Sequence, residues 1–497
     1  MLFSSWLRNG KRSAPAARRR TQTPPRQRAG FFPRLEVLED RVVPSGYQQL
    51  DLVGYQHGMG HFTDANLNGW GMTSMPTGLF VVANTFSTGL ATFYDSSGHV
   101  LPEKIIVPVS VTGSATLSAA LGVDISTKYG HPTGVVYNPT KDFVITNPDT
   151  GVSAPATLIF DSIDGTISGW NPRVDATHAI LIRDTWAAST PSAERTDSVF
   201  TGLEIGQDSQ GNNVLYAADF LNNDVQIIGN GKDGFFTTLK TISTAGRGVS
   251  SDPNYSWVWS VQAVGSNLYV TFADLLNPKG GGGGAVDVYN MDGKFLYQLD
   301  ANGPGAGRLQ NPWGITQAPA NFGAYSNDLL VGNVAGAGNI NVYNPNTGQY
   351  LGLLRQPDGA PIAIKGLWDL EFGDGTPDGG KANWLYFDAG PNHPGDSTGG
   401  LFGVIHAAGD DRNHGLDDQG WLMSASRMSS PTVSSPDGML QQQIDAIFQK
   451  FDAVLLSLDA NLTALHPQLS GFFALLHSNL DALEATVLDR LDAPGNR

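Results

Sequence analysis

Short apolar segments that end in Asn or Asp recur six times between Trp70 and Ile405. The apolar segments are Leu79–Ala83, Thr157–Phe160, Val214–Ala218, Leu268–Ala273, Leu329–Gly332 and Trp384–Phe387. The polar residues that follow them are Asn84, Asp161, Asp219, Asp274, Asn333 and Asp388. Each is followed by a second apolar segment, and segments of this length between tight turns are typical of β-strands. Six repeats of this kind predict a six-bladed β-propeller.

The spacing of the repeats leaves room for four strands in each. The repeats align on Gly71, Gly134, Gly202, Val261, Gly314 and Asp369, at intervals of 53 to 68 residues. A four-stranded blade takes about 40–50 residues, so each repeat has room for a modest insertion. A ring of blades must also join its ends, because an open ring leaves strand edges exposed. We expect the strand-like segment Tyr47–Tyr55 to complete the sixth blade beside Leu401–Ile405.

Composition separates the propeller from its flanking regions. Residues 1–46 form a basic tail, which we expect to be disordered because residues 8–30 are rich in Pro, Arg and Ser. Residues 47–408 contain the repeats. Residues 409–437 are rich in Asp, Gly, Ser and Pro and form a polar linker.

The last region, residues 438–493, changes to a helical pattern. Its apolar residues, such as Leu440, Ile444 and Ile447, are spaced three and four apart, and Pro467 interrupts the series. This pattern predicts two amphipathic helices that form a hairpin. The apolar stripe either packs within the chain or, as in a coiled coil, joins copies of the chain into a homo-oligomer.

Composition and charge narrow the classes of function. Only 15% of residues are charged and 60 of 497 are glycine, a balance typical of many short strands joined by turns. Cysteine is absent, which excludes thiolate zinc sites and a cysteine nucleophile. Residues 1–41 hold ten of the 30 basic residues and three of the 46 acidic ones, so the remainder carries a net charge of −23. An acidic body of this kind repels phosphate groups, so we expect no nucleic-acid partner.

No apolar stretch is long enough to predict a transmembrane helix. The basic N-terminus also lacks the apolar core of a standard signal peptide. Residues 35–45 read LEVLEDRVVPS, which resembles an L-E-x-L-E-D-R-x-x-P-S element near the N-terminus of many large exported or surface proteins of certain bacteria. The resemblance implies export to the cell surface or the exterior, while a disordered basic arm is the alternative interpretation.

The repeats themselves also resemble a known group. Matching stretches include Asp164–Trp170, Leu215–Phe220, Asn311–Ile315, Leu329–Asn333, Gly366–Leu370, Leu385–Phe387 and Gly400–Gly403. They are similar to an uncharacterised family of bacterial exported six-bladed propellers, distantly similar to NHL-repeat proteins. The first repeat departs from this pattern, with Gly69 where the fifth has Pro312. The resemblance implies a fold and export, and it implies no activity.

The six Asn and Asp markers allow two interpretations. Their oxygens could form a ring of Ca²⁺ ligands around the channel of the propeller. A short polar side chain at a strand end also bonds the backbone of the next turn, which every blade of a repeat protein would need. We favour the structural interpretation because the markers occur in every repeat.

Two hypotheses for the function follow. The first is a non-enzymatic binding or interaction module whose partner is a protein, a glycan or a small molecule. The second is a metal-dependent hydrolase or lyase that acts on a small molecule or glycan at the channel mouth. Such an enzyme needs convergent carboxylates, and Glu204 and Asp369 are the acidic candidates. Fold analogy alone does not choose between the two.

Overall fold

The computed structural model describes residues 46–409 except 86–87, 122–126, 191, 193, 231–235, 246, 248–255, 275–282, 300–307 and 391–399. The predicted basic tail, polar linker and helical hairpin lie outside the described residues, apart from Gly46 and Gly409.

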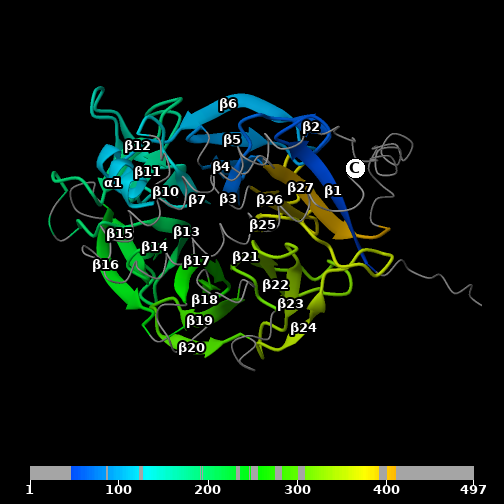
Figure 1. Ribbon diagram of the computed structural model, residues 1–497. Helices are drawn as coiled ribbons and strands as arrows, with labels where there is room; N and C mark the ends of the chain where they lie inside the picture. Colours follow the sequence, from blue (N-terminus) through cyan, green and yellow to red (C-terminus); the bar gives the residue numbers. More distant parts are fainter. Residues whose placement is uncertain are drawn as a thin grey trace, which may run out of the picture. The chain divides into compact units, whose positions relative to one another are not determined.

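The described strands form six blades around one axis, each built on four antiparallel strands (Figure 1). From the axis outward, the first blade comprises β3 (Gly69–Ser74), β4 (Phe80–Asn84), β5 (Leu90–Tyr94) and β6 (Val100–Ile106). The second comprises β7 (Pro132–Tyr137), β10 (Leu158–Ser162), β11 (Thr166–Trp170) and β12 (Ile180–Asp184). The third comprises β13 (Phe200–Gln207), β14 (Asn213–Asp219), β15 (Asp224–Asn230) and β16 (Phe236–Ser243).

The remaining three blades repeat this order. The fourth comprises β17 (Trp257–Val264), β18 (Asn267–Asp274), β19 (Gly283–Asn290) and β20 (Phe295–Gln298). The fifth comprises β21 (Pro312–Gln317), β22 (Leu329–Asn333), β23 (Ile340–Tyr343) and β24 (Tyr350–Leu353). The sixth comprises β25 (Leu367–Phe372), β26 (Leu385–Ala389), β27 (Leu401–Ala407) and β1 (Tyr47–Gly54). The prediction of a six-bladed propeller is therefore confirmed.

The second strand of each blade is buried on both faces, which explains why the sequence reveals it. Every residue of β4, β10, β22 and β26 is buried, because each blade packs between two others. Such strands appear in the sequence as continuous apolar runs. The outermost strands, such as β16, have mostly half-buried or exposed residues and give a weaker signal.

The N-terminal strand closes the ring. β1 pairs antiparallel with β27, from Tyr47 opposite Ala407 to Gly54 opposite Leu401. The short β2 (Phe62–Thr63) then pairs in parallel with β1. Leu52 and Val53 are buried in the core that the sixth blade shares with the first. The predicted role of Tyr47–Tyr55 in completing the sixth blade is confirmed.

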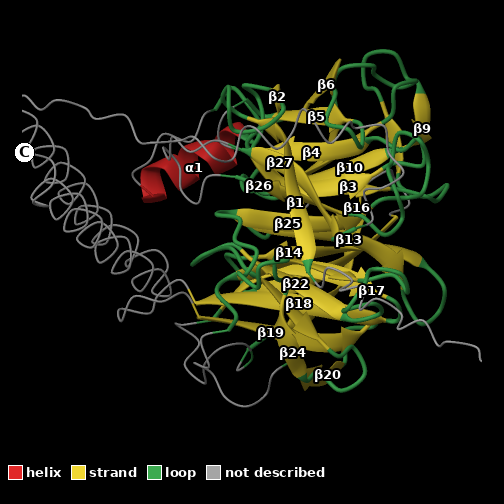
Figure 2. Cartoon of the chain, turned by 90° about the vertical axis from the view of Figure 1, so that its right-hand side faces the viewer, coloured by secondary structure: helices red, strands yellow, loops and turns green. Residues whose placement is uncertain are grey.

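Two insertions escaped prediction, one between the first and second blades and one within the second blade. Helix α1 (Val111–Leu121) follows the first blade, and Figure 2 shows it at one face of the ring. Ser110 caps it, since its Oγ accepts the Gly113 N–H at 2.9 Å. The second is a two-stranded sheet of β8 (Val144–Thr146) and β9 (Ser153–Pro155). Within the described residues, no helix has the length and apolar character that a membrane crossing requires.

The alignment of the fourth repeat on Val261 is wrong by one residue. Gly71 pairs with Ala83 just after a bulge in β3, and the corresponding residue after the bulge in β17 is Ser260, opposite Thr271. Val261 instead matches the buried apolar residue that follows each of the other alignment positions. The fourth repeat misled the prediction because it has no glycine at this point.

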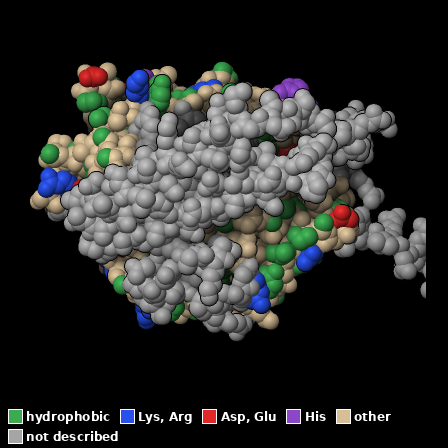
Figure 3. All heavy atoms as spheres, viewed as in Figure 1, with side chains coloured by type: hydrophobic (Ala, Val, Ile, Leu, Met, Phe, Trp, Pro, Cys, Tyr) green, Lys and Arg blue, Asp and Glu red, His purple; other side chains and the backbone are tan. Residues whose placement is uncertain are grey.

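The described side chains that are visible in Figure 3 include both basic and acidic residues. Among the described residues visible in Figure 3, basic and acidic side chains are spread around the rim without a patch of one sign.

Shortening a buried leucine of the closing strand should destabilise the ring. Leu52 is 3% exposed, and Leu52→Ala should lower the free energy of unfolding by about 2–5 kcal/mol because it leaves a cavity. Leu351→Ala is the matched control, since Leu351 is 42% exposed on β24 and its truncation should cost under about 0.5 kcal/mol. Chemical denaturation of both variants checks this, and equal effects would contradict the closing role of β1.

Candidate functional site

Tryptophan side chains fill the channel where four of the inner strands begin. Trp70, Trp259, Trp313 and Trp368 come from β3, β17, β21 and β25. The rings of Trp70 and Trp368 stack with centroids 4.0 Å apart, and Trp259 lies 5.8 Å from Trp368. Leu117 of α1 packs into the same cluster. Trp70, Trp313 and Trp368 are buried, so they serve packing and do not offer open faces to a sugar ring.

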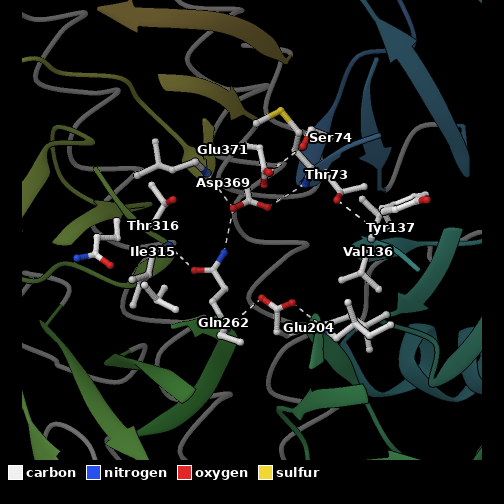
Figure 4. Close-up of a pocket in the computed structure, with 18 of the residues that line it drawn as sticks. Thr73, Ser74, Val136, Tyr137, Glu204, Gln262, Ile315, Thr316, Asp369 and Glu371 are labelled. Atoms are coloured by element: carbon white, nitrogen blue, oxygen red, sulfur yellow. Dashed lines mark hydrogen bonds between the residues drawn. The ribbon is translucent and has the colours of Figure 1, made fainter. Parts of the chain in front are cut away.

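A pocket of about 470 Å³ lies further along the same six strands. Each of β3, β7, β13, β17, β21 and β25 contributes to its wall, so the pocket is the mouth of the propeller channel. Three acidic residues line it, Glu204, Asp369 and Glu371, together with Gln262 (Figure 4). The structure therefore brings both acidic candidates, Glu204 and Asp369, to one site.

Asp369 is fixed by bonds to three strands. Its Oδ2 accepts the Met72 N–H at 2.9 Å, which ties the sixth blade to the first. Its Oδ1 accepts the Leu370 N–H at 2.8 Å and the Gln262 side-chain amide at 3.0 Å. Gln262 Oε1 in turn accepts the Ile315 N–H of the fifth blade. Asp369 is thus the centre of a polar network across the channel.

Glu204 is held from the opposite wall. Its Oε1 accepts the Ile205 N–H at 2.7 Å, and its Oε2 accepts the Ala263 N–H of the fourth blade at 3.0 Å. Both oxygens are therefore directed by backbone amides, which fixes the carboxyl group in place.

Glu371 has the least constrained carboxyl group of the three. Its Oε1 accepts the Ser74 hydroxyl of the first blade at 2.9 Å. Its Oε2 has no hydrogen-bond partner among the described residues. The side chain is half-buried, so part of it faces the pocket.

These contacts follow one rule around the ring. Glu204, Gln262 and Glu371 occupy equivalent positions on their inner strands, and each bonds a group of the next blade. In the first blade Thr73 does the same, because its Oγ1 accepts the Tyr137 N–H at 3.3 Å. The polar residues of the pocket therefore also hold neighbouring blades together.

Burial raises the pKa of all three carboxyl groups. Burial raises the pKa of Glu204 and of Asp369 to about 7 each. The hydrogen bonds that these carboxyl groups accept from backbone amides act in the opposite direction and lower the pKa. Burial, with the nearby charge of Asp369, raises the pKa of Glu371 to about 8. Asp388 lies behind the pocket, where its Oδ1 accepts the Asp369 N–H at 2.8 Å, and burial raises its pKa well above the usual range. Near neutral pH the site therefore holds protons that ordinary carboxylates have lost.

The Asn and Asp markers lie elsewhere. The described side chains of Asn84, Asp161, Asp219, Asn333 and Asp388 are buried, and none lines the pocket. They bond backbone: Asn84 Oδ1 accepts the Asn68 N–H at 2.7 Å, and Asn333 Oδ1 accepts the Gln310 N–H at 2.7 Å. The side chain of Asp274 lies outside the described residues. Asp161 Oδ1 and Asp388 Oδ1 also accept backbone amides, those of Gly134 and Asp369.

Sequence reasoning missed Glu371 and Gln262. Glu371 stands two residues after Asp369, and residues two apart on a strand point to the same face. No neighbouring residue in the sequence marks Gln262 as functional. Once the fourth repeat is aligned on Ser260, Gln262 occupies the position equivalent to Glu204. The bulges that set this alignment are seen only in the strand pairing of the folded chain.

The described residues do not form a preassembled metal site. The residues that the structure describes contain no group of three His, Cys, Asp or Glu side chains that could hold a metal ion. Glu204 and Asp369 share a pocket, but each is bonded to backbone on its own wall. A cation could be bound here only through fewer direct protein ligands or after rearrangement of these bonds.

Comparison with other proteins identifies similar sequences, but these belong to uncharacterised proteins. No protein-family model matches the chain. The chain is 28% identical over 348 residues to Uncharacterized protein L690 of Acanthamoeba polyphaga mimivirus, covering 68% of this chain and 80% of that protein. It is 28% identical over 351 residues to Uncharacterized protein R648 of the same virus, covering 69% and 77%.

Among solved structures, the chain is similar to a protein of unknown function from Bacteroides thetaiotaomicron VPI-5482, with a TM-score of 0.42 and 9% identity over 73% of this chain and 76% of the other. It is also similar to the WD40 repeats of RRP9, with a TM-score of 0.36 and 12% identity over 73% and 97%. The fold assignment itself rests on the strand pairings described above.

The raised pKa of Glu371 predicts a pH-dependent effect of its removal. The folded chain keeps this proton up to about pH 8, whereas the unfolded chain loses it near pH 4, so the carboxyl disfavours folding increasingly as the pH rises between the two values. Glu371→Gln removes this titration, and its stability relative to the wild type should rise between about pH 5 and pH 9. Urea denaturation at stepped pH measures the difference.

The control for this experiment is Glu103→Gln, since Glu103 is exposed on β6. Its difference from the wild type should stay constant over the same pH range. If Glu371→Gln also gave a constant difference, the carboxyl of Glu371 would not be held in its protonated form at neutral pH.

Proposed function

We propose that this protein is a ligand-binding propeller and that its ligand occupies the channel-mouth pocket. One observation supports this most directly: the pocket contains the carboxyl groups of Glu204, Asp369 and Glu371, and none of the described residues that line it is Lys, Arg or His. Buried acidic groups are costly unless something compensates them. A cavity of about 470 Å³ is also large enough for a small molecule.

The site is preorganised for binding. Both oxygens of Glu204 and of Asp369 accept backbone amides, so these carboxyl groups do not need to be ordered when a ligand arrives. Binding to groups that are already fixed avoids part of the entropy cost of association. The tryptophan cluster fills the channel where the same strands begin, which limits the ligand to one mouth.

The wider setting is also part of the proposal. The LEVLEDRVVPS element and the resemblance of the repeats to exported propellers support a place outside the cell or at its surface. A protein or glycan partner at the rim is compatible with this setting, since propellers commonly expose loops for interaction. Residues 438–493 are proposed to join copies of the chain through their apolar stripe.

A metal-dependent hydrolase or lyase is the second candidate function. It is supported by the position of Glu204 and Asp369 in the same pocket and by their raised pKa, a combination found at many catalytic sites. A bound Ca²⁺ would neutralise these carboxylates and polarise an oxygen of a substrate. This candidate requires that a divalent cation binds in the pocket.

A thermal-shift screen of the full chain tests the proposed function. The screen covers Ca²⁺, Mg²⁺, monosaccharides and small amines, and a ligand of the pocket should raise the melting temperature further as its concentration exceeds its Kd. The shift should disappear in Glu204→Gln and in Glu371→Gln, and it should persist in Glu103→Gln. A shift that survives both pocket variants would place the ligand elsewhere.

Analytical ultracentrifugation tests the proposed assembly. If residues 438–493 join copies of the chain, the full chain should sediment as an oligomer and a chain that ends at residue 437 should sediment as a monomer. Equal sedimentation of the two chains as monomers would remove homo-oligomerisation from the proposal.

A further inference from the structure

The acidic groups of the pocket are divided between opposite walls. Glu204 comes from β13 of the third blade, while Asp369 and Glu371 come from β25 of the sixth. In a ring of six blades the third and the sixth face each other across the axis. Figure 4 shows Glu204 on one side of the pocket and Asp369 with Glu371 on the other. Negative charge therefore approaches the cavity from two sides.

The walls between these acids are largely uncharged. Val135 and Val136 of the second blade line one side, and Ile315 and Thr316 of the fifth blade line the other. Met72 and Leu203 add further apolar surface. A ligand that spans the two acidic walls would thus lie against aliphatic side chains along its length.

This arrangement does not suit a single metal ion. Glu204 and Asp369 each accept a backbone amide on their own wall, so chelation of one small cation between them would need these bonds to rearrange. A neutral polyol could bond the protonated carboxyl groups, but it would supply no counter-charge once they ionise above about pH 8. What fits both the charge and the apolar walls is an elongated cation with a charge at each end.

We propose that the pocket binds a short aliphatic diamine, with one ammonium group at Glu204 and the other at Glu371 and Asp369. This inference rests on the proposed function of the pocket and specifies the class of its ligand. Gln262 holds Asp369 in position through its side-chain amide at 3.0 Å, and the hydrocarbon part of the ligand packs on Val136 and Ile315.

Binding of this ligand should depend on pH. The titratable groups that line the pocket are Glu204 of β13, Asp369 and Glu371 of β25, and Tyr137 of β7, with Asp388 of β26 behind Asp369. The lining residues from β3, β17 and β21 include no titratable side chain. An ammonium group requires the carboxylates to be ionised, and burial raises the pKa of Glu371 to about 8, so binding should strengthen from about pH 6 to pH 9 and should release protons.

Isothermal titration calorimetry of the full chain with 1,4-diaminobutane at about pH 8 tests the proposal. We expect one diamine per chain, and we expect Glu204→Gln and Glu371→Gln each to weaken binding about tenfold or more. Glu103→Gln should leave binding unchanged. Thr316→Lys, which places an ammonium group in the pocket, should abolish it. Titrations in two buffers of different ionisation enthalpy should show proton release.

The controls separate this inference from the proposed function. The neutral 1,4-butanediol should not bind, and butylamine, with one charge, should bind about tenfold more weakly than the diamine. If Ca²⁺ or the diol binds and the pocket variants abolish that binding while the diamine fails, the pocket is a binding site but the ligand class is wrong. If the diamine binds equally well to all variants, it binds the acidic surface and the inference is overturned. If no ligand binds at all, both the inference and the proposed function fail.

Discussion

Backbone contact between neighbouring inner strands is the constraint on which the rest of this propeller depends. A Cβ atom at Gly71 would lie 2.3 Å from the Thr133 oxygen, and one at Gly134 would lie 2.4 Å from the Leu203 nitrogen. Gly314 is equally tight against the Trp368 oxygen at 2.6 Å. Glycine is needed at these positions because there is no room for a side chain. These glycines hold three pairs of neighbouring inner strands, β3 with β7, β7 with β13 and β21 with β25, at close range.

The channel is lined differently on the two sides of these close backbone contacts. Large tryptophans gather where the strands begin, and the polar residues lie about 10 Å further along, three residues beyond the tryptophans. A side chain replaces the glycine at two positions, Ser260 and Asp369, and that of Asp369 lies at the junction where the last blade meets the first. The residue that closes the ring is thus also a wall of the pocket. Blade contacts and the proposed binding thus use the same side chains, which explains why acids with raised pKa values are tolerated there.

The sequence predicts the architecture well because the second strand of each blade is buried on both faces. Continuous apolar runs such as Leu329–Gly332 fall on such strands, and the closing strand was found by the same reasoning. Helix α1 was missed because it lacks charges at both ends and has only a weak apolar face. The fourth repeat was misaligned because Ser260 stands where other blades have glycine, and a bulge is invisible in the sequence.

The site was only half predictable, for a physical reason. Glu204 and Asp369 were singled out by their nearness to the alignment positions, and the fold does bring them to one pocket. The significance of Glu371 and Gln262 depends on which blades face each other across the axis, which a linear pattern of repeats does not contain. The markers, by contrast, do not share one structural role. Asn84 and Asn333 bond the segments that lead into inner strands, while Asp388 bonds the amide of Asp369 itself.

The most direct test of this account is a crystal structure of the protein soaked with 1,4-diaminobutane at about pH 8, where its amines are charged. We predict electron density for one diamine in the channel mouth, with one nitrogen within hydrogen-bond distance of Glu204 and the other of Glu371. Density for the diamine only on the outer surface, with the pocket occupied by water alone, would contradict the claim that these three carboxyl groups form a binding site.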